Sequence, residues 1–245
     1  MGAREETLAM LRSGMSPKDI TRARSVSINT TLGYLDQLVG QGDLRRSDVF
    51  FSVPKDVRIS IGGLVDIVRK GHWTIQHLIK LCKENGKSAD YEDIITILKY
   101  GDSRHALGDM YEDIREIETR LHEAIQITLE EEYGEGEMEW WREGITLSIR
   151  QNCQARREED EYPVEDPYDY TELLDLWTIL DKKWIVLKKV LPENMIVNKQ
   201  TLHENFIHLN QIRRNVMHPV RGIIPSEEDF EFIRKFKTDL FPVNK

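Results

Sequence analysis

The sequence predicts a mainly α-helical protein. A winged helix-turn-helix (residues 1–58) and a helical connector (59–104) are expected to precede an α-helical bundle (105–245). In most segments apolar residues recur at spacings of three and four, which is the period of an amphipathic helix. A short β-branched and aromatic run before Pro54 is typical of the hairpin in a wing. With 40% hydrophobic and 31% charged residues over 245 positions, the composition is that of a globular protein.

The N-terminal module is divided by clear helix start and stop residues. Ser16 is a favourable N-cap, followed by Pro17 at the first helical position and Asp19 at the third. Ser27 can cap the next helix, whose apolar pattern stops at Gly40. The predicted elements are helices over 7–12, 17–23 and 28–39 and a wing hairpin over 45–53.

Longer helical patterns fill the rest of the chain. Between 59 and 101, apolar groups at helical spacing are separated by breaks that contain glycine, which indicates the connector. The next helix has an apolar seam that starts at Met110, and we expect it to end near Tyr133. Stripes over 173–191 and from Leu202 onward complete the expected bundle.

Two stretches inside the bundle interrupt these patterns. Between 158 and 169, seven of twelve residues are acidic and two are proline, so this stretch is expected to be an exposed loop. Trp140 and Trp141 could stack on nucleic-acid bases. Because tryptophans beside a helix start more often pack into a core, we expect both to be structural.

Composition excludes several classes of protein. The net charge of -9 argues against nucleic-acid binding along the whole chain, although residues 1–60 carry a net charge of +2. No apolar run approaches the roughly 20 residues of a membrane span, and residues 1–20 hold no secretory signal, so we expect a cytoplasmic protein without membrane contact. Cys82 and Cys153 are far apart, which predicts buried free thiols. Neither a metal site nor a cofactor is predicted.

Arg213 is the most unusual residue in the sequence. On a helical wheel it falls about 20° from the centre of an apolar arc that includes Phe206 and Leu209. A guanidinium at such a position is costly unless it is paired or opens onto a site. His218 lies where Pro219 ends the helix, and can turn back beside Arg213.

Each of these two residues also has a structural interpretation. Arg213 could pair with an acid on the predicted helix over 173–191. His218 could interact with the C-terminal helix dipole.

An arginine followed by four residues and then histidine, near the end of the last long helix of a bundle, resembles the signature of the HEPN superfamily. The similarity covers roughly residues 105–225 and includes the LNQIR and VMHP stretches around Arg213 and His218. The family pattern commonly has Asn, Asp or His directly after the arginine, whereas this chain has Arg214 there and Asn215 one place later. The resemblance implies a homodimer in which the motifs of two chains face one cleft.

Members of this superfamily are often metal-independent endoribonucleases, and these residue types suit that chemistry. Histidine can move a proton from the 2′-hydroxyl or to the 5′-oxygen of RNA, while arginine can stabilise the phosphorane. We therefore assign catalytic roles to Arg213 and His218 and supporting contacts to Arg214 and Asn215. The expected RNA products carry 2′,3′-cyclic phosphate and 5′-hydroxyl ends.

This reading implies a toxin or an antiphage-defence effector. One alternative is a non-catalytic DNA-binding regulator or adaptor in which the bundle only dimerises. Another is a nucleotide-sensing or docking module for a neighbouring enzyme.

The N-terminal module, over roughly residues 5–55, resembles the helix-turn-helix accessory domain of some RecQ-type helicases. Such domains bind DNA or other proteins, and both partners remain open here. Asp36 and the small positive charge of this module favour protein docking, whereas its outward polar side chains favour DNA. The candidate DNA-binding residues are Asn29, Thr30, Gly33 and Gln37 for the major groove and Arg45 and Arg46 for phosphates.

Overall fold

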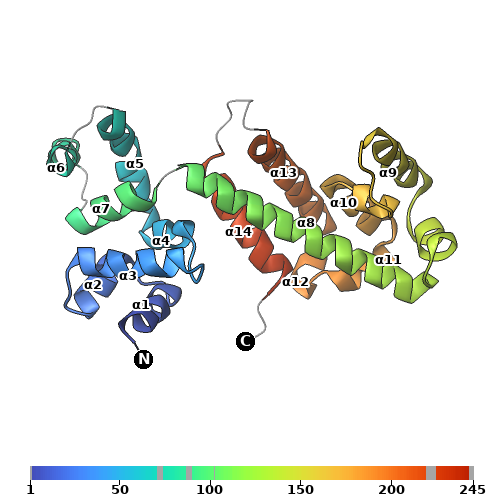
Figure 1. The fold of residues 1–245 in the computed structure, drawn as a ribbon, viewed down its shortest axis with the longest axis horizontal. Coiled ribbons are helices and arrows are strands. Elements are labelled where there is room, and N and C mark those ends of the chain that lie inside the picture. The colour runs from blue at the N-terminus through green and yellow to red at the C-terminus, as the bar shows by residue number, and fades with distance from the viewer. Residues whose placement is uncertain (1, 71–73, 87–89, 102, 219–224, 243–245) are drawn as a thin grey trace. The chain divides into compact units, whose positions relative to one another are not determined.

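A computed structural model describes residues 2–70, 74–86, 90–101, 103–218 and 225–242. The chain forms two compact units, Met1–Asp109 (unit 1) and Met110–Lys245 (unit 2). Within the described ranges the regular structure is helical and holds no strand, which confirms the mainly α prediction (Figure 1). No helix in these ranges is both long and apolar enough to cross a bilayer.

The first helices of unit 1 begin where their capping residues predict. The Ser16 hydroxyl accepts the backbone N–H of Asp19 at 3.2 Å, and the Ser27 hydroxyl accepts that of Thr30 at 3.1 Å. Ser25 adopts a left-handed conformation, with φ of 52°, in the turn between the second and third helices. The three helices are α1 (Ala3–Arg12), α2 (Pro17–Ala23) and α3 (Ile28–Gly40).

The predicted wing hairpin over 45–53 is wrong, because this segment contains helix α4 (Arg46–Ser52). The backbone N–H of Arg45 donates to the Asp48 carboxylate at 3.0 Å and so caps the helix. Val49 of α4 and Val53, which directly follows the helix in extended geometry, are both buried. Strand propensity depends on context, and burial of these side chains outweighs it here.

The predicted connector is helical and packs within unit 1. It contains α5 (Lys55–Lys70), α6 (Ile75–Glu84) and α7 (Tyr91–Tyr100). α7 contacts α2, α4, α5 and α6. It contributes Tyr100 to the apolar cluster of α1–α4, and Ile94 and Ile97 to a second cluster with α5 and α6.

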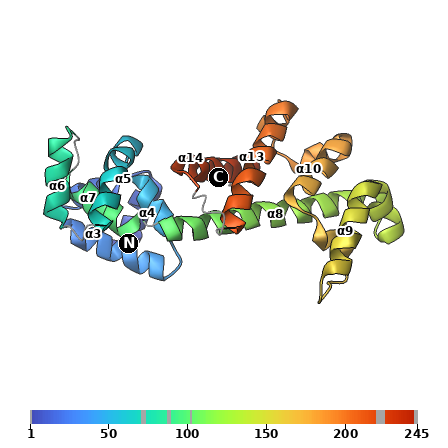
Figure 2. The ribbon, with the colours of Figure 1, turned by 90° about the horizontal axis from the view of Figure 1, so that it is seen from above.

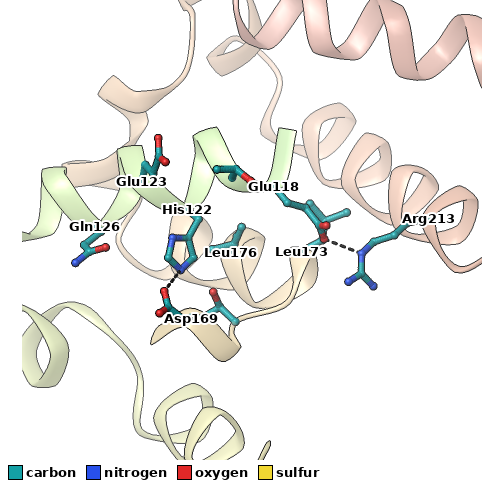
Figure 3. Close-up of a pocket in the computed structure, with 10 residues that line it drawn as sticks. Glu118, His122, Glu123, Gln126, Asp169, Leu173, Leu176 and Arg213 are labelled. Carbon is teal, nitrogen blue, oxygen red and sulfur yellow. Dashed lines mark ion pairs between the residues drawn. The ribbon is translucent and has the colours of Figure 1, made fainter. Parts of the chain in front are cut away.

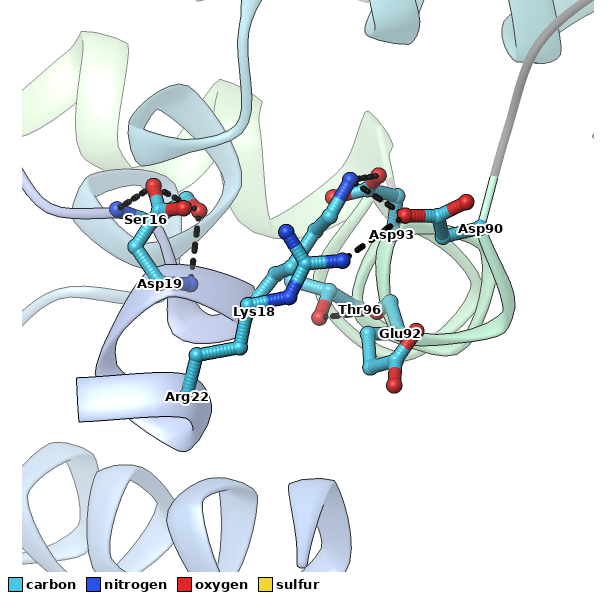
Figure 4. A network of polar contacts seen from close by, with 8 residues as sticks. All are labelled: Ser16, Lys18, Asp19, Arg22, Asp90, Glu92, Asp93 and Thr96. Carbon is cyan, nitrogen blue, oxygen red and sulfur yellow. Dashed lines mark hydrogen bonds and ion pairs between the residues drawn. The ribbon is translucent and has the colours of Figure 1, made fainter. Parts of the chain in front are cut away.

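A polar network fixes α7 against α2 (Figure 4). The Lys18 ammonium lies 2.6 Å from Asp90 Oδ2 and 3.0 Å from Asp93 Oδ2, and Arg22 also reaches Asp90 at 3.2 Å. The side chain of Asp93 is only 3% exposed, and burial raises the pKa of its carboxyl group despite the nearby ammonium. Lys18 is therefore the main counter-charge of a buried acid.

Unit 2 is organised along the long helix α8, with α9, α10, α13 and α14 arrayed beside it (Figures 1 and 2). Its elements are α8 (Ser103–Tyr133, in unit 2 from Met110), a π-helical segment η1 (Glu137–Gly144), α9 (Leu147–Glu159), the short 3₁₀ turn η2 (Pro167–Tyr170), α10 (Leu173–Lys182), α11 (Trp184–Leu187), the short 3₁₀ turn η3 (Lys188–Val190), α12 (Glu193–Ile196), α13 (Lys199–Met217) and α14 (Glu227–Leu240).

The predicted seam of α8 is confirmed as the centre of this core. Ile114, Ile117 and Leu121 on that seam are fully buried. Trp140 and Trp141 are also buried, as predicted, and their rings pack edge-on against Tyr168. The described cysteines are buried free thiols, as expected, and burial raises the pKa of Cys153 to about 11.

Two details of the bundle differ from the sequence prediction. The stripe over 173–191 is not one helix, because α10 ends at Lys182 and the next residue, Lys183, leaves helical geometry with a φ of -108° and a ψ of 30°. The Lys183 ammonium instead donates to the carbonyl of Glu143. The acidic loop over 158–169 is exposed only in part, since Tyr168 in η2 is fully buried.

Candidate functional site

The apolar face of α13 is covered within its own chain. Phe206 is fully buried, with its ring stacked on Trp177 of α10 at 5.1 Å and edge-on to Phe236 of α14 at 5.5 Å between centroids. Leu202, Leu209 and Ile212 on the same face are buried as well. The stripe that surrounds Arg213 in the sequence is therefore a core face of the bundle.

Arg213 is not fully buried in this core face, and it pairs with an acid on α8. Its Nε lies 2.7 Å from Oε1 of Glu118, with the two side chains 25% and 21% exposed. The contact is electrostatic, because Nε makes no well-directed hydrogen bond within the described residues. The alternative that placed the partner on the helix over 173–191 is thus wrong, since the acid belongs to α8.

Burial raises the pKa of Glu118, and the Arg213 charge offsets this only in part.

Glu118 and Arg213 line a pocket of about 490 Å³ between α8, α10 and α13 (Figure 3). The α8 wall also carries His122, one helical turn after Glu118, and the opposite wall holds Asp169 and Thr171. The hydroxyl oxygen of Thr171 is buried and makes no hydrogen bond within the described part of the chain. The pocket therefore combines one cation, an imidazole and an unsatisfied hydroxyl with the carboxylates of Glu118, Glu123 and Asp169.

The terminal nitrogens of Arg213 are donors that no described residue occupies. In the described ranges the only partner of its guanidinium is Glu118, which contacts Nε. In Figure 3 the two Nη atoms point away from Glu118. A planar pair of N–H groups of this kind matches two oxygens of a phosphate.

The side chain of His122 makes three contacts with Tyr168 and Asp169. Its ring stacks on Tyr168 with the centroids 4.0 Å apart, and its Nε2 lies 3.2 Å from the Tyr168 carbonyl oxygen and 3.8 Å from Oδ1 of Asp169. Because a carbonyl can only accept, Nε2 carries the proton and donates it. Nδ1 is left as the acceptor nitrogen of the ring.

The predicted residues of the α13 motif do not all meet in this pocket. Arg213 lines it, whereas His218 is exposed at the end of α13, with φ of -124° and ψ of 66°, and is not part of its lining. Arg214 is exposed and Asn215 is half-buried. α13 ends at Met217, as expected, while Pro219 lies outside the described residues.

Glu118, His122 and Asp169 were not predicted from the sequence. Glu118, His122 and Gln126 recur every four residues on α8, beside its apolar seam, and this polar line is the signal that could have identified two of them.

The N-terminal candidates divide into two groups. Asn29, Thr30 and Gln37 are exposed along α3, and Gly33 beside them is half-buried. These positions form an exposed polar face on α3, the helix that carries the candidate major-groove residues.

The two arginines have other partners. Arg46 donates to the Lys99 carbonyl and lies over the Tyr100 ring, 5.1 Å from its centroid, so it is used inside unit 1. Arg45 caps α4, and its Nε is 3.8 Å from the Asp48 carboxylate. Asp36 likewise accepts a hydrogen bond from the Tyr100 hydroxyl at 2.6 Å.

Compared with known protein families, curated proteins and solved structures, the chain gives no match. Within the described ranges no group of three or more His, Cys, Asp or Glu side chains is arranged to hold a metal ion.

Proposed function

We propose that unit 2 is a metal-independent endoribonuclease of the HEPN type that acts as a toxin or antiphage-defence effector. The observation that carries the proposal is the Arg213 guanidinium. It is anchored through Nε by Glu118 and lines a pocket that also holds an oriented imidazole. Such a fork binds two non-bridging phosphate oxygens and stabilises the charge of a phosphorane.

In this proposal His218 is the acid that protonates the leaving 5′-oxygen. Its place at the exposed end of α13 leaves it accessible to a polynucleotide. Arg214, exposed one residue after Arg213, adds a contact to a neighbouring phosphate, and Asn215 supports the same end of the helix.

Incubation of the purified full chain with total RNA, with and without EDTA, tests the proposal. We expect cleavage in both reactions, because no proposed step uses a metal ion. Intact RNA in both reactions would overturn the proposal, and cleavage that disappears with EDTA would contradict its metal independence.

We also propose that two copies pair across the exposed side of α13. Ile207, Gln211, Arg214 and His218 lie at helical spacing on one side of this helix, and all are exposed, with Ile207 37% exposed. We therefore expect sedimentation equilibrium to show a dimer at micromolar concentration and Ile207→Asp to shift it toward monomer. A monomeric wild type would overturn this pairing, which brings together the exposed side of α13 and not Arg213, because Arg213 pairs with Glu118 of its own chain.

The second candidate is a non-catalytic DNA-binding regulator or adaptor that binds through a helix-turn-helix of α2 and α3. The open face formed by Asn29, Thr30 and Gln37 favours it. If unit 1 binds duplex DNA, Gln37→Glu should weaken binding about 10-fold, since a carboxylate would then face the groove. Fluorescence anisotropy against a salt series measures this. Unchanged affinity, or none in the wild type, would favour docking to a protein.

A further inference from the structure

A second pocket of unit 2, with a volume of about 450 Å³, lies near the C-terminal end of α8. It adjoins the Arg213 pocket, because Gln126 lines both. Its other walls come from the π-helical segment η1 and from the loop that leads into η2, and carboxylates and tryptophans dominate them. These residues are Glu130 of α8, Trp140 and Trp141 of η1, and Glu165 and Asp166 of the loop.

Among the described side chains, three carboxylates and neither a lysine nor an arginine line this pocket. Glu130 and Asp166 are half-buried, and Glu165 is exposed. Within the described ranges none of these acids forms an ion pair. Arg157 reaches the same loop, but its Nε donates to the carbonyl oxygen of Val164 at 2.9 Å. The negative charge of the pocket is therefore not compensated by its own lining.

The two tryptophans provide an apolar wall and two hydrogen-bond donors. Trp140 and Trp141 are only 5% and 7% exposed, and both line the pocket. In the described part of the chain neither indole N–H has an acceptor. A buried tryptophan N–H usually finds a partner, so these donors are available to a carbonyl oxygen of a ligand.

This combination of side chains favours an organic cation and excludes a phosphate. Carboxylates pair with a guanidinium through two parallel hydrogen bonds, and the faces of indole rings attract cations. The same three carboxylates repel the phosphate backbone of RNA. This pocket is therefore distinct in chemistry from the Arg213 pocket, whose lining includes a guanidinium.

We infer that this pocket binds an arginine side chain of a partner protein. The guanidinium supplies the missing positive charge, and the peptide carbonyl groups beside it supply acceptors for the indole N–H groups. A polyamine carries the charge but has no such acceptor. The surroundings fit a basic partner segment, since seven of the twelve residues over 158–169 are acidic. The inference does not depend on the ribonuclease proposal.

An NMR titration of the full chain with acetyl-Gly-Arg-Gly-amide tests the inference. We expect the indole N–H signals of Trp140 and Trp141 to shift and to saturate at millimolar peptide. The signal of Trp184, which packs under Lys199 and does not line the pocket, should stay in place. The same peptide with citrulline, a neutral isostere of arginine, should bind at least about tenfold more weakly, because it makes no charge-assisted hydrogen bonds.

A carboxamide variant tests the pocket itself. Glu130→Gln should weaken binding of the arginine peptide about tenfold, because it removes one of the charges that pair with the guanidinium. The fold should be kept, since the new amide oxygen can still accept the hydrogen bond that Gln126 donates to Glu130 at 3.0 Å. Glu132→Gln is the matched control, because Glu132 is an exposed acid of the same helix that does not line the pocket. Unchanged indole signals without peptide confirm that both variants are folded.

Four results would overturn the inference. They are unshifted Trp140 and Trp141 signals in the wild type, equal binding of the citrulline peptide, equal losses of affinity in Glu130→Gln and Glu132→Gln, and binding of spermidine as tight as that of the arginine peptide. The last result would assign the pocket to a free polyamine. RNA cleavage, whether present or absent, bears only on the ribonuclease proposal.

Discussion

Replacing Arg213 with Lys should lower the rate of RNA cleavage by about 10²-fold or more. Lysine keeps the positive charge and can still pair with Glu118, but it loses the planar fork that grips two phosphate oxygens. Removing one preorganised donor to a transition-state oxyanion typically costs about 10²–10³ in kcat. Single-turnover rates on one RNA substrate measure the effect.

The same substitution distinguishes catalysis from structure. If Arg213 only neutralised Glu118, a lysine ammonium would serve nearly as well, and stability and activity would both be close to wild type. Arg214→Lys is the control, because Arg214 is exposed and contributes a point charge to the proposed RNA contact. Equal activity of the two variants would show that the fork of Arg213 has no catalytic role.

In unit 1, Lys18→Met should reduce the free energy of unfolding by about 2–3 kcal/mol at pH 7. The change leaves the buried Asp93 without its main counter-charge, which is costly in a site of low polarity. We set the value below that for a fully buried pair, because the side chain of Lys18 is 22% exposed.

The loss of unfolding free energy caused by Lys18→Met should become smaller as the pH falls. Burial already raises the pKa of Asp93 above its usual 3.8, so the folded state favours the protonated acid. The stability that the folded state gains by binding a proton at Asp93 is fully present below pH 3.8 and is lost as the pH rises through the pKa of the folded state. Without Lys18 the pKa rises further, so the variant approaches the wild type near pH 4.

Hydrogen exchange in denaturant, followed on peptides from α2 and α7, localises this loss to unit 1. Lys80→Met is the control, since Lys80 is 74% exposed and pairs with Glu84 at only 3.7 Å. Equal losses of unfolding free energy for Lys18→Met and Lys80→Met would contradict the assigned role of Lys18. So would a loss for Lys18→Met that becomes larger toward acid pH.

Local chemistry in the sequence was enough to predict most helix boundaries in the N-terminal module. Ser16 and Ser27 cap their helices through the bonds that these residue types usually make. The wing prediction was wrong because β-branched and aromatic residues such as Val49 fit a half-buried strand and a buried helix face equally well. Only tertiary packing decides between them, and here Val49 packs in the cluster of α1–α3 while Val53 packs with α5–α7.

The candidate site could be predicted only in part. Arg213 was found because a guanidinium on an apolar face needs a partner, and Glu118 is that partner. Its identity depends on the way α8 packs against α13, which no local pattern encodes. His122 escaped notice because a polar line beside an apolar seam is also typical of a solvated helix face.

The most direct test of the central claim is the chemistry of the RNA ends that the wild-type chain produces in EDTA. Mass spectrometry of a short RNA after incubation should show 2′,3′-cyclic phosphate and 5′-hydroxyl ends, and Arg213→Ala should produce neither. Fragments with 3′-hydroxyl and 5′-phosphate ends, or equal cleavage by Arg213→Ala, would contradict an Arg213-centred, metal-independent ribonuclease.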